Sequence, residues 1–144
     1  MMNMRKSKAF TLIELLIVIA IISVLAAISF PSYVAYMERT HRLDTQSSML
    51  DLASSLEIYR SQNLSYQGAK VSDLAPSLAN NQFYTIVLSP DPLPAGSQDY
   101  EITATPKSTE RMKGTGAMKL NSNGESCWDE TSDTSCTYGT HSWN

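Results

Sequence analysis

Residues 8–14, which read KAFTLIE, join a short basic segment to an apolar run that continues to Phe30. A helix of about twenty apolar residues rises about 30 Å, which is enough to cross a bilayer. Glu14 is the one carboxylate in this run, and an ionised carboxylate inside a bilayer is costly unless it has a partner or a purpose. The reason for a glutamate at this position therefore decides how the chain is interpreted.

Two cleavage sites are compatible with this junction. An ordinary secretory signal is cut after its apolar core, at small residues, and residues 27–29 (AIS) would supply such a site. That interpretation leaves the run longer than a usual signal core and gives Glu14 no role. In the second interpretation the cut falls between Ala9 and Phe10, so that the apolar helix is kept and Glu14 becomes the fifth residue of the mature chain.

Residues 9–15 (AFTLIEL) resemble the class III signal of type IV prepilins and type II secretion pseudopilins, and the similarity continues through residues 31–33 (PSY) and a long polar helix. The resemblance implies that a membrane-embedded prepilin peptidase removes the leader and methylates the new terminal residue, Phe10. The chain departs from the family pattern before the cut, where Ala9 stands in place of the usual Gly. Alanine is also small, and whether it slows processing stays open.

Cleavage after Ala9 would place a cationic amine on Phe10, one helical turn before the anionic Glu14. An unpaired charge in a membrane or a packed filament core is costly, and pairing recovers part of the desolvation free energy. The resemblance implies that Glu14 pairs with the Phe10 amine of a neighbouring subunit and sets the axial register. The alternative is a tolerated carboxylate, either protonated or reaching toward the membrane surface.

The charge pattern orients the apolar helix. Arg5, Lys6 and Lys8 precede it with no acid to offset them, so the positive-inside rule keeps the amino terminus in the cytoplasm and exports the rest. The chain has 11 Lys+Arg and 14 Asp+Glu; without the three leader cations, 8 face 14, a net charge of −6. This balance argues against a chain-wide nucleic-acid surface, because affinity for phosphate depends on clustered cations.

Cys127 and Cys136 are the only cysteines of the chain. In an exported domain such a pair indicates a disulfide, and closing so short a loop contributes about 2–3 kcal/mol. The resemblance points the same way, since many type IV pilins close a carboxyl-terminal loop by such a bridge.

Metal ligands are sparse around this loop. A zinc site would need further soft or imidazole ligands, of which only His141 is nearby. Asp129, Glu130 and Asp133 offer oxygen ligands of the kind that calcium prefers, as in the analogous loop of some pseudopilins, but their spacing is not that of an EF-hand. We therefore predict no metal and no cofactor.

The helix is expected to change character at Pro31, which removes one backbone donor and can kink or locally melt a helix. In related pilins this region becomes extended in the filament, so Pro31 is either a hinge or a simple kink. Beyond it, residues 31–62 are amphipathic, and one apolar stripe is expected to pack on a sheet of the same subunit. The stripe consists of Met49, Leu52, Ala53, Leu56 and Tyr59.

After the helix the signals are those of loops and short strands. Residues 65–69 and 73–76 are predicted to be loops and turns. Residues 83–88 (FYTIVL), 100–105 (YEITAT) and 118–121 (MKLN) are predicted to be strands, with an Asn123-Gly124 turn after the last. The short connections favour antiparallel pairing into three or four strands, and the pattern up to Cys127-Trp128 resembles the sheet of PilE-like minor pilins.

Two remaining features allow competing interpretations. The turn-rich segment 126–144 carries Trp128, Tyr138, His141 and Trp143, which we expect to pack under the disulfide loop rather than to form a binding surface. A basic stretch lies around the preceding hairpin, and we expect it to be a solvated loop rather than a DNA contact. The stretch consists of Lys107, Arg111, Lys113 and Lys119.

The sequence thus predicts an α+β protein of the type IV pilin fold: a long amino-terminal helix, its hydrophobic half protruding, packed on a small antiparallel sheet with a disulfide-closed carboxyl-terminal loop. Residues 1–9 form the cleaved cytoplasmic leader and residues 10–30 the transmembrane or filament-core segment. Residues 31–62 form the amphipathic helix, and residues 63–144 the loop, sheet and disulfide region.

The predicted function is that of a structural pilus subunit, a minor pilin, for twitching motility, adhesion or DNA uptake. It would sit in the inner membrane as a single-pass protein before an assembly platform moves it, with other pilin subunits, into a surface filament. No nucleophile elbow, phosphate-binding glycine loop or zincin motif occurs, so enzymatic activity is not expected. The alternatives are a type II secretion pseudopilin and a signal-cleaved secreted binding domain.

Overall fold

The structure, a computed structural model, describes residues 10–109, 111–140 and 142–143. These residues fall into two structural units, one that ends at Met37 and one that begins at Glu38. Helix α1, Leu12–Asn63, belongs to both units. It is followed by α2 (Val71–Leu74), α3 (Pro76–Ala79), β1 (Tyr84–Ser89), β2 (Glu101–Pro106), β3 (Ala117–Asn121) and β4 (Ser126–Asp129).

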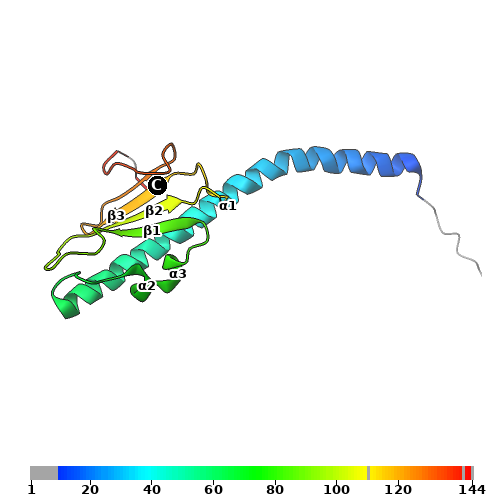
Figure 1. Ribbon diagram of the computed structural model, residues 1–144. Helices are drawn as coiled ribbons and strands as arrows, with labels where there is room; N and C mark the ends of the chain where they lie inside the picture. Colours follow the sequence, from blue (N-terminus) through cyan, green and yellow to red (C-terminus); the bar gives the residue numbers. More distant parts are fainter. Residues whose placement is uncertain (1–9, 110, 141, 144) are drawn as a thin grey trace, which may run out of the picture. The chain divides into compact units, whose positions relative to one another are not determined.

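The second unit places one antiparallel sheet against the carboxyl-terminal half of α1 (Figure 1). The strand order is β1-β2-β3-β4, and each strand pairs antiparallel with the next. The predicted α+β class is confirmed, with the four-stranded version of the sheet. Each predicted strand is present, with bounds that differ from the prediction by at most one residue.

The hydrophobic core lies between α1 and the sheet. Met49, Leu52 and Leu56 are fully buried on α1, and Ala53 and Tyr59 pack partly buried against the same core, so the predicted stripe is confirmed. The sheet residues that pack against this stripe alternate along the strands, as expected when one face of a sheet is buried. They include Ile102, Ala104, Met118 and Leu120. Full burial of a leucine, isoleucine or methionine side chain in this core contributes about 1.5–3 kcal/mol to stability.

The prediction of a loop over residues 73–76 was wrong, because two one-turn helices occupy this region beside β1 (Figure 1). In α2 the backbone N–H groups of Asp73 and Leu74 both donate to the Lys70 carbonyl. Pro76 opens α3, a position where its missing N–H costs nothing and its fixed φ suits a helix. Leu78 then reaches the core with 2% of its surface exposed. Burial of apolar residues on these short turns overrode their turn-forming composition.

The turn between β3 and β4 is built by Asn121 and Gly124. The Asn121 side-chain oxygen accepts hydrogen bonds from the backbone N–H groups of Asn123 and Glu125, and Gly124 adopts a φ of 78°. Glycine reaches this left-handed region without a steric penalty. The predicted Asn123-Gly124 turn is therefore confirmed.

Candidate functional site

Helix α1 begins with a reciprocal pair of hydrogen bonds. The backbone N–H of Thr11 donates to Glu14 Oε2 at 3.4 Å, and the backbone N–H of Glu14 donates to Thr11 Oγ1 at 3.3 Å. This is a capping box, which satisfies two of the N–H groups that every helix start leaves without an intrahelical partner. Glu14 therefore has a role within its own chain. Sequence reasoning missed it, although Thr11-x-x-Glu14 is the pattern that signals such a cap.

The apolar stretch that follows has no tertiary partner among the described residues of its own unit, 10–37. Residues 10–33 are all exposed, and helix α1 contains a window with a mean hydropathy of 2.8 that is long and apolar enough to cross a membrane. Phe10, Leu12 and Ile28 expose 81%, 77% and 68% of their surface. Contiguous apolar surface of this size needs lipid or other helices around it.

Two features shape the surface of this stretch. The Ser23 hydroxyl donates to the Ile19 carbonyl at 2.7 Å. It therefore has a hydrogen-bond partner within the helix and needs none from lipid or another subunit. Ala20, Ile21, Val24 and Leu25 line a shallow, wholly apolar hollow of about 300 Å³. A small residue between larger ones lets another helix approach closely.

Pro31 lies inside α1. It cannot donate to the carbonyl of Ala27, the residue four positions before it, so the helix lacks one hydrogen bond there. Its assignment as a hinge or a kink stays a prediction.

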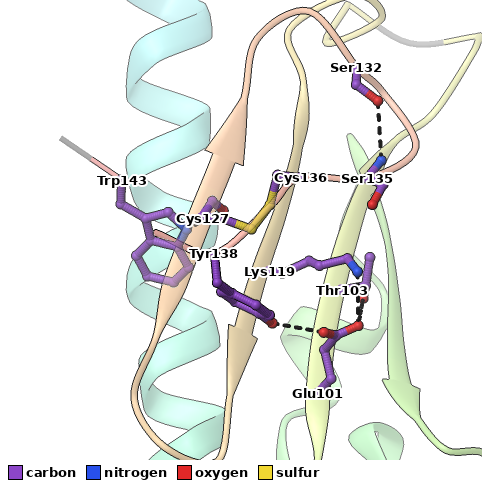
Figure 2. Close-up of a disulfide and its surroundings, with 9 residues drawn as sticks. All are labelled: Glu101, Thr103, Lys119, Cys127, Ser132, Ser135, Cys136, Tyr138 and Trp143. Atoms are coloured by element: carbon purple, nitrogen blue, oxygen red, sulfur yellow. Dashed lines mark hydrogen bonds and ion pairs between the residues drawn. A yellow bond between two sulfur atoms is a disulfide. The ribbon is translucent and has the colours of Figure 1, made fainter. Parts of the chain in front are cut away.

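The carboxyl-terminal end is closed by a disulfide between Cys127 of β4 and Cys136, with a Cα–Cα distance of 5.8 Å (Figure 2). This confirms the predicted pairing. Trp143 Nε1 donates to the Cys127 carbonyl at 2.7 Å, and the Tyr138 hydroxyl donates to Glu101 Oε2 at 2.9 Å. These bonds tie the chain after the disulfide back onto β4 and β2.

Glu101 is the polar centre of this face of the sheet. Besides Tyr138 it receives Lys119 Nζ from β3, at 3.1 Å from Oε1 (Figure 2). Burial, reinforced by the bond to Glu101, raises the pKa of Tyr138. Tyr138 is therefore a neutral hydrogen-bond donor at physiological pH.

Trp128 joins β4 to the loop between β2 and β3 and to α1. Its Nε1 donates to the Thr115 carbonyl at 2.8 Å, and the Arg42 guanidinium lies 3.7 Å from its ring centroid. Together with the contacts of Tyr138 and Trp143, this supports the interpretation that the aromatic side chains pack against their own subunit rather than form an exposed binding surface. His141, the fourth residue of that set, lies outside the described residues.

Two of the three carboxylates considered as calcium ligands, Asp129 and Asp133, accept hydrogen bonds from their own chain. The Asp133 side chain accepts from the backbone N–H groups of Gly114 and Gly116, at 2.7 and 3.0 Å, and the Asp129 side chain accepts from Thr131. Gly116 has a φ of 92°, and a Cβ there would lie 2.2 Å from the Asp129 carbonyl oxygen. Among the described residues no group of three potential metal ligands occurs.

A second polar cluster lies near the end of α1. The Tyr66 hydroxyl donates to Glu57 and accepts from Arg60 Nη1, which lies 3.4 Å away. The Tyr66 ring meets Tyr100 edge-on at 4.9 Å. Burial, followed by Glu57, raises the pKa of Tyr66, and burial raises that of Tyr100 to about 12. The cluster fixes residues after α1 against the sheet.

The predicted basic stretch is divided by the structure. Lys107 Nζ donates to the Asn81 carbonyl at 2.6 Å, and Lys119 pairs with Glu101. Only Arg111 and Lys113 of that set are exposed. Of the remaining predicted site residues, Ala9 lies outside the described part of the chain.

The geometry defines a protein with a disulfide-closed α+β unit and an apolar helix that requires partners. The family profile described as "Type IV minor pilin ComP, DNA uptake sequence receptor" matches residues 31–120. The profile of the prokaryotic N-terminal methylation motif matches residues 4–30. The chain belongs to the type IV pilin family.

Individual relatives agree with this assignment. The fimbrial protein EcpC of Eikenella corrodens is 35% identical over 141 residues, 91% of this chain and 86% of EcpC. The type IV wide pilus major component PilA4 of Thermus thermophilus is 40% identical over 87 residues, 58% of this chain and 66% of PilA4. The type II secretion system core protein G of Klebsiella pneumoniae is 32% identical over 78 residues, 51% of this chain and 56% of that protein.

A solved structure supports the fold alone. The non-core minor pilin PilV of Neisseria meningitidis has a TM-score of 0.55 at 20% identity, with 70% of this chain and 94% of that chain covered. The predicted pilin fold is thus confirmed.

Proposed function

We propose that this chain is a structural, non-catalytic subunit of a type IV pilus. The observation that carries the proposal is the apolar stretch of residues 10–30, exposed throughout and with a single carboxylate near its start. A membrane can cover this surface before assembly, and the same stretches of neighbouring subunits can cover it in a filament. Because lipid and packed helices are similarly apolar, the transfer between them is driven by close packing and by polar pairs rather than by the hydrophobic effect.

The route to the filament is inferred from the similarity to prepilins, and the charge pattern gives the orientation of the helix. Prepilin peptidase cuts between Ala9 and Phe10 and methylates Phe10, the leader stays cytoplasmic, and the assembly platform moves the mature chain out of the inner membrane. The match of the methylation motif to residues 4–30 supports this processing. In the filament, Glu14 pairs with the Phe10 amine of a neighbouring subunit, while Pro31 provides a point where the helix bends or opens.

The test is the intact mass and amino-terminal peptide of the mature protein, taken from cell membranes and from sheared surface filaments. We expect a chain that begins with N-methyl-Phe10 in both fractions. A chain that begins near Phe30 would remove the apolar stretch and leave a secreted binding domain. A correctly processed chain that is absent from sheared filaments would also overturn the pilus assignment.

DNA uptake is a second candidate role, favoured by the match of residues 31–120 to a minor pilin family described as a DNA uptake sequence receptor. The exposed Arg111 and Lys113 are the cations that would meet DNA. If they bind phosphates, the affinity of the purified protein for duplex DNA falls steeply with salt. Deletion of the gene, scored for twitching, DNA uptake and protein secretion, separates a DNA receptor from a subunit needed for motility or adhesion.

The similarity to core protein G makes a secretion pseudopilin the remaining alternative. A calcium-dependent pseudopilin loses thermal stability when a chelator removes its ion. We expect the unfolding temperature of this protein to stay unchanged in a chelator, because Asp133 and Asp129 hold backbone and hydroxyl groups instead. A drop on chelation, restored by calcium, would favour the pseudopilin.

A further inference from the structure

The face of α1 that points away from the core carries a row of exposed residues without charge. Successive residues of a helix are turned by about 100°, so residues three and four apart share a face. Starting at residue 40, such steps meet an exposed residue at every position. We call this row the outer seam; it consists of Thr40, Leu43, Ser47, Leu50, Ser54, Ile58 and Ser61.

The composition of the outer seam is that of a contact surface. Leu43, Leu50 and Ile58 expose 48%, 53% and 57% of their surface, although the side of a helix that faces only water is normally charged or polar. Between them lie small hydroxyl residues, which leave hollows where another chain can approach. The core lies on the opposite side, so the seam contributes nothing to the packing of its own subunit.

An acidic border runs along the outer seam. Asp44 and Asp51 follow Leu43 and Leu50 directly, and both are exposed. They are seven residues apart, or about 10 Å along the helix. Neither carboxylate has an ion-pair partner among the residues that the structure describes. The surface therefore combines apolar contacts with two unpaired negative charges on one side.

The complementary charges lie in the loop between β2 and β3 of the same chain. Arg111 and Lys113 are exposed there and likewise have no ion-pair partner in the described part of the chain. Between them, Met112 is fully buried, and Asp133 holds the following glycines through two backbone hydrogen bonds. This part of the loop is thus held in place, so its backbone loses little conformational entropy when the two cations bind a partner.

We propose that the outer seam of one subunit binds the β2–β3 loop of a second copy of this chain. Arg111 and Lys113 then pair with Asp44 and Asp51, and the aliphatic parts of the basic side chains cover Leu43 and Leu50. Because the two surfaces differ, the contact is heterologous and repeats from subunit to subunit, which generates an open helical filament rather than a closed dimer. The inference rests on the proposed function, since it names a contact within the filament.

A protein partner fits the loop better than a nucleic acid does. Affinity for DNA grows with the number of phosphates neutralised, and Lys107 and Lys119 of the neighbouring sequence are already held by Asn81 and Glu101. The two cations of the loop match in number the two carboxylates beside the outer seam of a second copy. Like charges, by contrast, would oppose contact between two outer seams.

The experiment is a charge exchange in full-length protein, in cells where the variant is the only copy of this chain. Asp44→Lys with Asp51→Lys, and separately Arg111→Glu with Lys113→Glu, should each lower the share of the protein in sheared filaments about tenfold relative to the membrane pool. All four substitutions together should restore the wild-type share, because the pairs form again with reversed sign. Asp73→Lys with Asp91→Lys, at exposed acids outside the seam, is the matched control and should leave incorporation unchanged.

Folding is checked by the unfolding temperature of each full-length variant in detergent, which should stay within about 2 °C of wild type for exposed positions. Normal incorporation of either double variant, or no recovery in the fourfold variant, would overturn the contact. Loss of DNA uptake in the Arg111/Lys113 variant at normal incorporation would assign the loop to nucleic acid instead. Failure of the pilus assignment itself looks different, since the wild-type chain would then be absent from sheared filaments.

Discussion

The two halves of helix α1 are stabilised in opposite ways. From residue 10 to residue 33 every side chain is exposed, and the only side-chain cap is the reciprocal pair of Thr11 and Glu14. From Thr45 onward one face is buried in a core with four strands, and the chain beyond is closed by a disulfide. One half needs partners outside the subunit, and the other carries its partners within it.

This difference separates folding from assembly. Substitutions on the buried face of the second half should change the stability of the subunit. Substitutions in the first half, or on the outer seam, should change incorporation into filaments and leave that stability intact. The separation can be tested with matched pairs of residues on the same helix.

The largest effect on stability is expected from Leu52→Ala. Leu52 is fully buried, and removing a buried leucine side chain costs about 2–5 kcal/mol, through lost burial and the cavity left behind. Leu50→Ala is the matched control, because Leu50 exposes 53% of its surface and should change stability by less than about 0.5 kcal/mol. Denaturant unfolding of the full-length proteins in detergent measures both. Equal losses in the two variants would break the proposed division of the helix.

Removal of the disulfide comes next. Replacing Cys127 and Cys136 together by alanine should lower the free energy of unfolding by about 2–3 kcal/mol, because the unfolded chain gains the freedom that the closed loop denies it. The loss should also loosen Trp143, whose indole bonds to the Cys127 carbonyl, and shift its fluorescence. Insertion into membranes should not change, because the length and hydropathy of the apolar stretch do not depend on the disulfide. Failure of the cysteine-free variant to insert would show that insertion depends on the closed loop.

Sequence patterns predicted those parts of the fold that depend on local periodicity. The stripe around Leu52 and Leu56 repeats with helical spacing, and YEITAT alternates as a strand does, so both were found. The one-turn helices at Val71–Leu74 and Pro76–Ala79 were missed, because four residues are too few to show a period and burial of Leu78 decides their shape.

The same limit applies to the candidate site. Cys127 and Cys136 could be paired from the sequence because they are the only two cysteines. The roles of Asp133 and Glu101 depend on residues that are distant in the sequence and that folding brings together. Asp133 accepts from Gly114, and Glu101 contacts Lys119 and Tyr138. No spacing along the chain predicts such pairs.

Glu14 tests the amino-terminal half, since it serves both the cap and the proposed pair with the Phe10 amine. Glu14→Gln keeps a side-chain acceptor for the capping box but removes the charge, whereas Glu14→Ala removes both. We expect both variants to be cleaved, both to lose incorporation into filaments, and only the alanine variant to lose about 1 kcal/mol of helix stability as well. Peptide mapping and sheared-filament yields measure these effects. Normal incorporation of the glutamine variant would leave capping as the only role of Glu14.

Leu64→Gly should have the smallest effect, and with the opposite sign. Leu64 follows the last residue of α1 with a φ of 58°, and its N–H donates to the Arg60 carbonyl at 2.7 Å, the position of a left-handed helix cap that favours glycine. Its side chain is 81% exposed, so no core contact is lost. A leucine in the left-handed region costs about 1–2 kcal/mol, and glycine removes that strain. Part of this gain is offset because glycine has more conformational freedom in the unfolded chain, so the net stabilisation should be about 0.5–1 kcal/mol. Leu64→Ala keeps the strain and should leave the free energy of unfolding unchanged. If alanine stabilises the subunit as much as glycine does, the exposed side chain rather than the backbone is the source of the effect, and the cap at the end of α1 is not strained.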